Sequence, residues 1–139
     1  MQIDIIGVPI DLGADRRGVD MGPSAIRYAH LHQKLIELGY TLEDKGNIEV
    51  PIQETCSITD PRLKYLDCIV PMGRRVAGAV ATSIQNGQFP LVIGGDHSLS
   101  LGSIRGAAKH KTASKKLTLN SFFTSSPRIH LFFIKGKFC

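Results

Sequence analysis

Hydrophobic residues in this chain occur either in short continuous runs or at helical spacing, with glycine and proline between them. Residues 2–8 form an isoleucine-rich run that ends before Pro9, and its length and composition predict a strand buried on both faces. A glycine-rich, charged loop is expected over residues 9–22. Pro23 then occupies a first helical position, and apolar residues follow helical spacing as far as Gly39, so one helix is predicted here.

The middle of the chain predicts a weak strand, a long connection and a helical region. The strand is expected around residues 40–44 and the connection over residues 45–60. Residues 62–86 have a helical pattern, but Pro71 lacks a backbone N–H and its ring crowds the preceding turn, and Gly73 follows closely. We therefore expect a break or kink at this point, which would divide the region into two shorter helices.

Two further elements complete the pattern. The run PLVIGG over residues 90–95 predicts a strand that ends in two glycines, and residues 98–110 predict a helix. Strands that alternate with helices indicate a parallel sheet with helices on both of its faces. The expected fold class is therefore α/β, with three layers and a mostly parallel sheet.

The composition changes abruptly near residue 111. Residues 1–110 contain eleven Lys and Arg against twelve Asp and Glu, whereas residues 111–139 contain six against none, so the net charge of +5 comes entirely from the tail. The tail also holds five of the six phenylalanines. We therefore expect a domain over residues 1–110 and a basic tail over residues 111–139 that is either disordered or forms one strand at IHLFFI. Scattered charges confined to a tail do not predict a nucleic-acid partner.

The chain carries no pattern that is typical of a membrane or secreted protein. No apolar run approaches the roughly 18 residues that a transmembrane helix needs, and the opening MQIDIIGVPIDLG lacks a basic region. A cytoplasmic location and no membrane partner are therefore predicted. Cys56, Cys68 and Cys139 are odd in number and widely spaced, which predicts buried or unreactive thiols in a reducing compartment.

The most informative segment for function is LVIGGDHSLS, residues 91–100. In an open parallel sheet ligands bind beyond the carboxyl ends of the strands, and Asp96 and His97 follow such an end directly. Gly94 and Gly95 would allow a tight turn, His97 could bind a metal through its imidazole, and Asp96 could orient a neighbouring group. The alternative, a turn histidine without a ligand, stays open. The segment lacks the spacing of dinucleotide, phosphate-binding and nucleophile-elbow motifs.

A second segment makes the pattern specific. Residues 5–27, IIGVPIDLGADRRGVDMGPSAIR, combine a strand end, a charged glycine-rich loop and a helix that starts with proline. Together with FPLVIGGDHS about seventy residues later, these motifs resemble the amino-terminal half of arginases over residues 1 to about 110. The RRGVDMGP form is more similar to arginases than to the related agmatinases. The resemblance implies a truncated arginase-like α/β fold.

The resemblance also implies a function. Arginases hydrolyse L-arginine to L-ornithine and urea at a pair of manganese ions, and the family's motif places the first metal ligand at His97. Asp96 would be a neighbour of this ligand that orients it and does not itself bind the metal. The loop over residues 16–22 would lie near the rim of the site or at a subunit contact, and the intact family members are expected to be homo-oligomers. Agmatine remains the alternative substrate within the family.

This chain lacks the remaining ligand motifs of the family. The DxHxD and DxD clusters are absent, and no Asp or Glu follows Asp96, so His110 and His130 cannot replace the missing acids. We expect the chain to be inactive alone and identify no catalytic residue in it. A noncatalytic fragment that associates with full-length arginase subunits is the alternative function. We interpret residues 111–139 as the result of a reading-frame change or an altered gene model.

Overall fold

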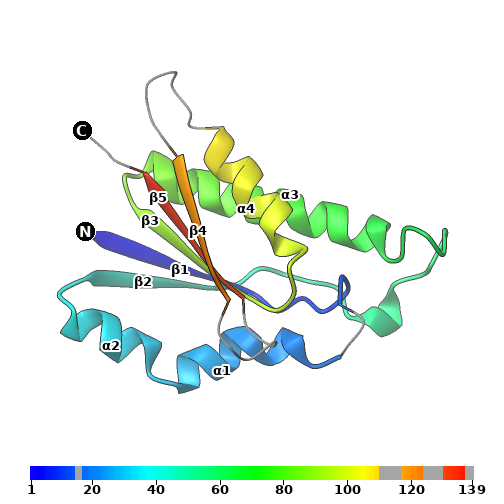
Figure 1. The fold of residues 1–139 in the computed structure, drawn as a ribbon, viewed down its shortest axis with the longest axis horizontal. Helices are drawn as coiled ribbons and strands as arrows, with labels where there is room; N and C mark the ends of the chain where they lie inside the picture. Colours follow the sequence, from blue (N-terminus) through cyan, green and yellow to red (C-terminus); the bar gives the residue numbers. More distant parts are fainter. Residues whose placement is uncertain (15–16, 110–116, 124–129, 137–139) are drawn as a thin grey trace.

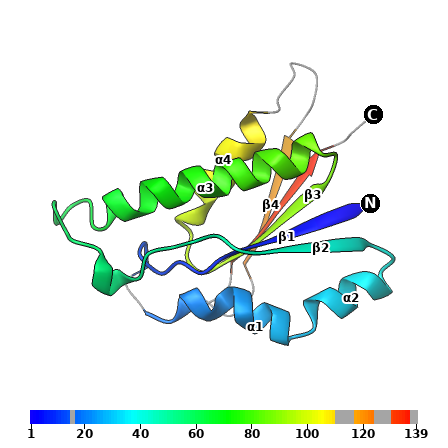
Figure 2. The same cartoon turned by 180° about the vertical axis from the view of Figure 1, so that it is seen from behind.

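The computed structural model describes residues 1–14, 17–109, 117–123 and 130–136, which form one sheet with helices on both faces (Figures 1 and 2). In chain order the strands and helices are β1 (Gln2–Val8), α1 (Gly22–Tyr28), α2 (Leu31–Glu37), β2 (Thr41–Asn47), α3 (Leu66–Gln85), β3 (Phe89–Gly94), α4 (Leu99–Ala108), β4 (Leu117–Phe123) and β5 (His130–Gly136). Helices α1 and α2 lie on one face of the sheet, and α3 and α4 lie on the other. The expected three-layer α/β class is confirmed.

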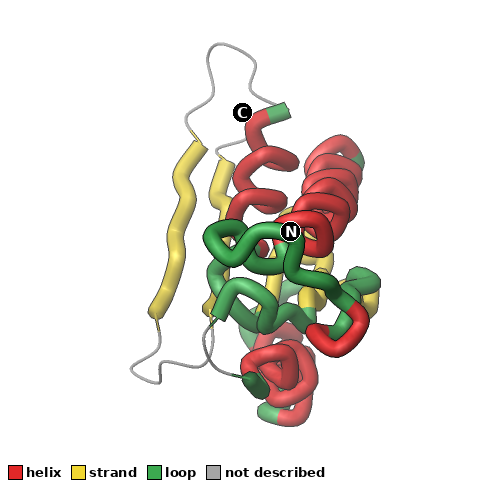
Figure 3. The backbone as a smooth tube through the Cα atoms, turned by 90° about the vertical axis from the view of Figure 1, so that its right-hand side faces the viewer, coloured by secondary structure: helices red, strands yellow, loops and turns green. Residues whose placement is uncertain are grey.

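The sheet has the strand order β2-β1-β3-β5-β4. Strands β2, β1 and β3 are parallel, whereas β5 is antiparallel to both β3 and β4. Figure 3 shows the sheet from its side, with β4 as the outermost strand. A lone strand at IHLFFI was one alternative for the tail; β5 covers His130 to Ile134 of this segment and is not alone, because it pairs with β4. The pairing gives the backbone groups on the outer edge of β3 hydrogen-bond partners, which a free edge would lack.

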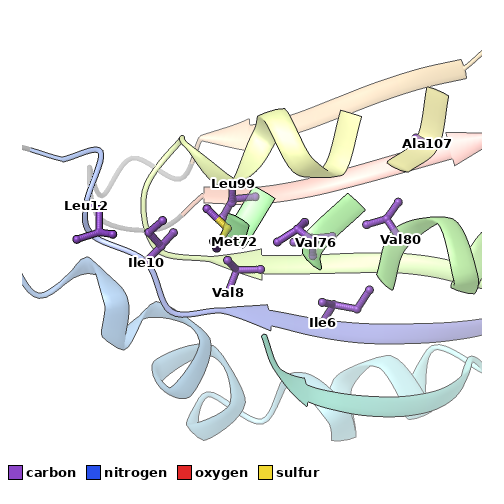
Figure 4. Close-up of a cluster of buried hydrophobic side chains, with 10 residues drawn as sticks. Ile6, Val8, Ile10, Leu12, Met72, Val76, Val80, Leu99 and Ala107 are labelled. Carbon is purple, nitrogen blue, oxygen red and sulfur yellow. The ribbon is translucent and has the colours of Figure 1, made fainter. Parts of the chain in front are cut away.

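The two faces of the sheet bury different apolar clusters because successive side chains of a strand point to opposite sides. Ile6 and Val8 belong to a cluster with Met72, Val76 and Val80 of α3, which Figure 4 shows in close-up. A second cluster lies on the opposite face, where α1 and α2 cover the sheet; its buried members are Ile3, Ile5, Leu91 and Ile93. The predicted strand buried on both faces is thus confirmed.

The predicted helix after Pro23 is two helices in the structure. His30 has a φ of 61°, in the left-handed region, and separates α1 from α2. Ile26 before the break and Leu31 and Leu35 after it all pack on the same core cluster. Apolar spacing could not reveal the break, because the residues on both sides of it serve the same face.

The break expected at Pro71 is wrong, since α3 runs without interruption from Leu66 to Gln85. The carbonyl that loses its hydrogen bond, four residues earlier, belongs to Asp67 at the exposed beginning of the helix. Met72 and the apolar residues that follow it at helical spacing are buried and hold the helix on the sheet. At 20 residues α3 is a long helix, but no helix in the described part of the chain has the apolar content and length needed to cross a membrane.

Strand β2 is confirmed where a weak strand was expected, and it extends three residues further, to Asn47. Its side chains are mostly exposed, so charged groups rather than apolar burial attach its end to α1. Arg27 donates two hydrogen bonds to the Asp44 carboxylate, at 2.7 and 2.8 Å, and one to the Asn47 side chain at 2.8 Å. The Arg27 hydrogen bond is the largest cause of a lowered pKa of Asp44.

The prediction of unpaired thiols is wrong for two of the three cysteines. Cys56 and Cys68 form a disulfide between the connection after β2 and the first turn of α3. Their Cα atoms lie 6.4 Å apart, within the range that a disulfide can span. The sequence contained no local signal for this pair, because a separation of 12 residues matches no short cysteine motif. Cys139 lies outside the described residues.

Helices α3 and α4 approach each other at two glycines of α4. A Cβ atom added at Gly102 would lie 2.6 Å from the Gly73 carbonyl oxygen, and one at Gly106 would lie 2.5 Å from the Ala77 carbonyl oxygen. These distances are shorter than any ordinary contact, so the backbones of the two helices could not remain so close with larger residues. The four-residue spacing of the glycines places both on one face of α4.

Gly102→Ala should lower the free energy of unfolding by about 2 kcal/mol, because the new methyl group meets the backbone of α3 and overpacking outweighs the gain in helix propensity. Urea unfolding followed by circular dichroism measures the change. The matched control is Gly78→Ala on the exposed side of α3, where an added Cβ meets nothing within 4 Å. This control should stabilise the protein by about 1 kcal/mol. Equal effects of the two substitutions would contradict the close helix contact.

Candidate functional site

The candidate site lies where the parallel strands β1 and β3 end. The Gly95 N–H donates to the Val8 carbonyl at 3.1 Å, and the Asp96 N–H donates to the Ile10 carbonyl at 2.9 Å. The backbone after β3 thus continues along the backbone after β1 for two residues beyond the sheet. Ile10, Leu12 and Leu99 belong to the same apolar cluster, which Figure 4 shows. Both loops are therefore anchored in the apolar core.

Asp96 connects the two loops through its carboxylate. It is 5% exposed and accepts hydrogen bonds from the Gly13 N–H at 2.7 Å, the Ser98 N–H at 2.8 Å and the Ser98 hydroxyl at 2.5 Å. Gly13 belongs to the loop after β1, and Ser98 precedes α4. A charged acceptor shared by three donors holds this local geometry more strongly than neutral acceptors would.

His97 lies between Asp96 and Ser98, at an exposed position of the turn. Its carbonyl accepts the Ser100 N–H at 3.0 Å, which joins the turn to the start of α4. The structure thus places His97 at the carboxyl edge of the parallel sheet, where the sequence predicted it. The expected role of Asp96 as an orienting residue has a structural counterpart in its bonds to Gly13 and Ser98, whereas metal binding by His97 stays a prediction.

Two glycines allow the chain to pass closely through this site. A Cβ atom at Gly95 would overlap the backbone of Ile10, so only glycine fits where the two loops meet. A Cβ atom at Gly22 would lie 2.5 Å from the Gly94 carbonyl oxygen, so the start of α1 also packs directly against the turn. The end of the RRGVDMGP motif is therefore beside the GGDHS motif, whereas the position of residues 16–22 at the rim of the site or at a subunit contact stays a prediction. Asp15 and Arg16 lie outside the described residues.

Sequence reasoning missed a charged cluster next to the site. Asp11 is 6% exposed and forms an ion pair with Arg17 at 2.9 Å. Arg17 also donates to the side chains of Gln53 at 2.6 Å and Glu54 at 2.9 Å. A backbone hydrogen bond within Glu54 and then the bond from Arg17 lower the pKa of this carboxyl group. Only the charge of the loop hinted at this cluster, since its members are up to 43 positions apart in the sequence.

The described residues alone do not fit a pair of manganese ions. Among the side chains that the structure describes, no group of three or more His, Cys, Asp or Glu could hold a metal ion. The Asp96 carboxylate is already shared by three donors, which leaves His97 as the exposed candidate ligand of the turn. Two divalent cations need several anionic oxygens to offset their repulsion. His130 begins β5 and pairs through its backbone register with Gly94, and His110 lies outside the described residues.

Known proteins are similar to this chain over most of its length. The model of the Arginase family matches residues 1–120. The chain belongs to this family. Relatives include the arginases of Brevibacillus brevis, 51% identical over 108 residues, and Bacillus subtilis strain 168, 50% identical over 108 residues. Each match covers 78% of this chain and 36% of the relative. The resemblance to arginases is thus confirmed.

Solved arginase structures support the fold over the same part of the chain. The Bacillus caldovelox arginase in its native form at pH 5.6 superposes with a TM-score of 0.73 at 49% identity, covering 78% of this chain and 36% of that one. A Clostridium difficile protein described as a putative agmatinase has a TM-score of 0.51 at 16% identity, which concerns the fold alone. The chain thus spans about a third of the length of these arginases. The domain boundary at residue 110 stays a prediction.

Asp96→Asn should lower the free energy of unfolding by about 2 kcal/mol, because a neutral amide replaces the charged acceptor of the Gly13 and Ser98 groups. Urea denaturation provides the measurement. Ser98→Ala removes one donor and leaves the carboxylate with two, so its cost should be smaller, about 1 kcal/mol. If Ser98→Ala costs as much as Asp96→Asn, the carboxylate does not join the two loops.

Proposed function

We propose that this chain carries the amino-terminal part of an arginase-type ureohydrolase site, which converts L-arginine and water to L-ornithine and urea, and that His97 is one of its manganese ligands. The observation that carries this proposal is the position of His97, exposed at the carboxyl edge of the parallel sheet within a turn that Asp96 holds. A neutral imidazole nitrogen is a suitable manganese ligand. Membership of the arginase family supports the assignment.

Arginine is proposed as the substrate in preference to agmatine. The RRGVDMGP motif, residues 16–23, is more similar to arginases than to agmatinases. The curated relatives named arginase are 42% to 51% identical to this chain, which supports the same substrate class. Subunit association as a homo-oligomer and a cytoplasmic location stay predictions for the complete family member.

The segment proposed here does not suffice for catalysis. Manganese prefers carboxylate, water and imidazole ligands, and the described residues supply one exposed imidazole at the sheet edge with no carboxylate cluster around it. The remaining ligands have to come from polypeptide that follows the family's first third. Strand β5 occupies the position next to β3, so a further parallel strand of an arginase could lie there only in place of this hairpin.

The purified chain, once circular dichroism shows that it is folded, should therefore produce no urea from arginine in the presence of manganese. Manganese binding is measured by electron paramagnetic resonance of the free ion, and we expect no tight pair of bound ions. Arginine-dependent urea that disappears in His97→Ala would contradict the requirement for further carboxylates. Co-purification of the inactive chain with a full-length arginase would instead favour a noncatalytic subunit.

A chimeric enzyme tests the contribution of this segment directly. Replacing the matched 108 residues of the Brevibacillus brevis arginase by those of this chain should retain urea production from arginine, since the two segments are 51% identical. In the chimera His97→Ala should reduce the activity by at least about 100-fold, more than the loss of a group that merely supports a ligand. His32→Ala on the exposed side of α2 is the matched control and should leave activity and manganese content unchanged. Equal activity of the two variants would refute the ligand role of His97.

A further inference from the structure

The Cys56–Cys68 disulfide joins two segments that have few other attachments to each other. Cys56 directly follows the short 3-10 turn η2 (Gln53–Thr55), and Cys68 is the third residue of α3. Between them, residues 57–64 are exposed except for Asp60, which is half-buried. The disulfide therefore closes a surface loop that contributes almost nothing to the apolar core.

The other interactions of this loop are local and exposed. The Thr59 hydroxyl donates to Asp67 at 2.9 Å, and the Arg62 N–H donates to Asp60 at 2.8 Å. Tyr65, at the start of α3, has a φ of 59°, a left-handed conformation that is costly for a residue with a side chain. The Tyr65 side chain packs against the apolar cluster, but residues 57–64 have only exposed hydrogen bonds, so the disulfide is the main constraint on this loop.

A chain of contacts leads from the disulfide to the loop after β1. The Cys56 N–H donates to the Gln53 carbonyl at 3.1 Å, and the Gln53 amide donates to the Tyr65 hydroxyl at 2.6 Å. The same Gln53 side chain accepts from Arg17 at 2.6 Å, and Arg17 pairs with Asp11 at 2.9 Å. Asp11 is two residues before Gly13, which donates to the carboxylate in the GGDHS turn. Order in the disulfide loop is thus connected to order near the candidate site.

We propose that Cys56 and Cys68 are a reversible thiol–disulfide site that controls the order of residues 57–64 and, through Gln53, of the loop around Arg17. The reacting partner is a low-molecular-weight disulfide. One cysteine thiolate attacks this disulfide and releases one thiol, and the second cysteine then attacks the mixed disulfide and releases the other. The protein loses two electrons and two protons, and the two released thiols carry both away. A dithiol reductant reverses the reaction.

The reduced protein keeps its apolar core, so reduction of the disulfide changes only the loop around it. Both cysteines pack at the margin of the apolar cluster under α3, whose fully buried members, Val76 and Val80 among them, lie further along the helix. Loss of the covalent bond therefore releases the exposed loop without opening the sheet, because local opening needs little apolar exposure. A disulfide with an exposed loop around it is also accessible to small thiols. This inference does not depend on the proposed arginase activity.

Thiol titration and limited trypsin digestion of the full chain test the proposal. With oxidised glutathione, non-reducing mass spectrometry should show Cys56 and Cys68 linked to each other without bound glutathione, and after a dithiol reductant all three cysteines should be titratable. Samples reduced, blocked with iodoacetamide and desalted should then be cut after Arg62 and Lys64 roughly tenfold faster or more than the oxidised protein, since cleavage follows the population of the open loop. Mass spectrometry identifies the cut sites and the blocked cysteines.

Variants distinguish the effect of the disulfide on trypsin cleavage from any effect of blocking the thiols. Cys56→Ser and Cys68→Ser should each be cut as fast in the oxidised sample as the reduced parent, whereas Cys139→Ser should behave as the parent does. Gln53→Ala should speed cleavage after Arg17 while cleavage after Arg62 in the oxidised protein stays slow. Circular dichroism confirms that each variant is folded, and the reduced parent provides the test without any substitution.

Three results would overturn the proposal. The pair does not form if Cys56 and Cys68 remain titratable, or each carries glutathione, after treatment with oxidised glutathione. The bond does not order the loop if the reduced and oxidised parent are cut at the same rate after Arg62 and Lys64. The link through Gln53 is wrong if neither reduction nor Gln53→Ala changes cleavage after Arg17.

Discussion

The parallel pairing of β1 with β3 is the constraint on which the candidate site depends. It places residues 3–8 in register with residues 89–94, so two loops that are far apart in the sequence leave the sheet at the same edge. The backbone continues this pairing beyond the sheet, and the Asp96 carboxylate closes it by accepting from both loops. Gly95 is required at the crossing because a side chain there would overlap Ile10. Exposure of His97 at this edge follows from these contacts.

The helices on the other side of the site depend on a second close approach. Gly102 and Gly106 let α4 lie directly on the backbone of α3, and the buried face of α3 seals the sheet beneath them. The turn before α4 is thereby held at both ends, by Asp96 at its start and by helix packing at its end. A histidine between two such anchors has little freedom to move, which is the preorganisation that the proposed ligand role of His97 needs.

The described residues supply only part of the proposed metal site. In the described residues acidic side chains near the sheet edge serve structural contacts, Asp96 with backbone donors and Asp11 with Arg17. On the outer edge of β3 the antiparallel strand β5 satisfies the backbone. The chain thus combines the first third of the family's length with a hairpin on the outer edge of β3. Family membership therefore does not imply that this chain alone is active.

The sequence by itself determined the class of the fold, the strands β1 and β3, the helix over α4 and the family, because each depends on local periodicity or on short motifs such as GGDHS. It did not reveal the break at His30, the continuity of α3 through Pro71, the Cys56–Cys68 pair or the Asp11–Arg17 cluster. These four features depend on contacts that form only in the tertiary structure. Burial of Met72 and Val76 outweighs one lost hydrogen bond at Pro71, and pairs of residues that are distant in the chain meet only after the helices have packed on the sheet.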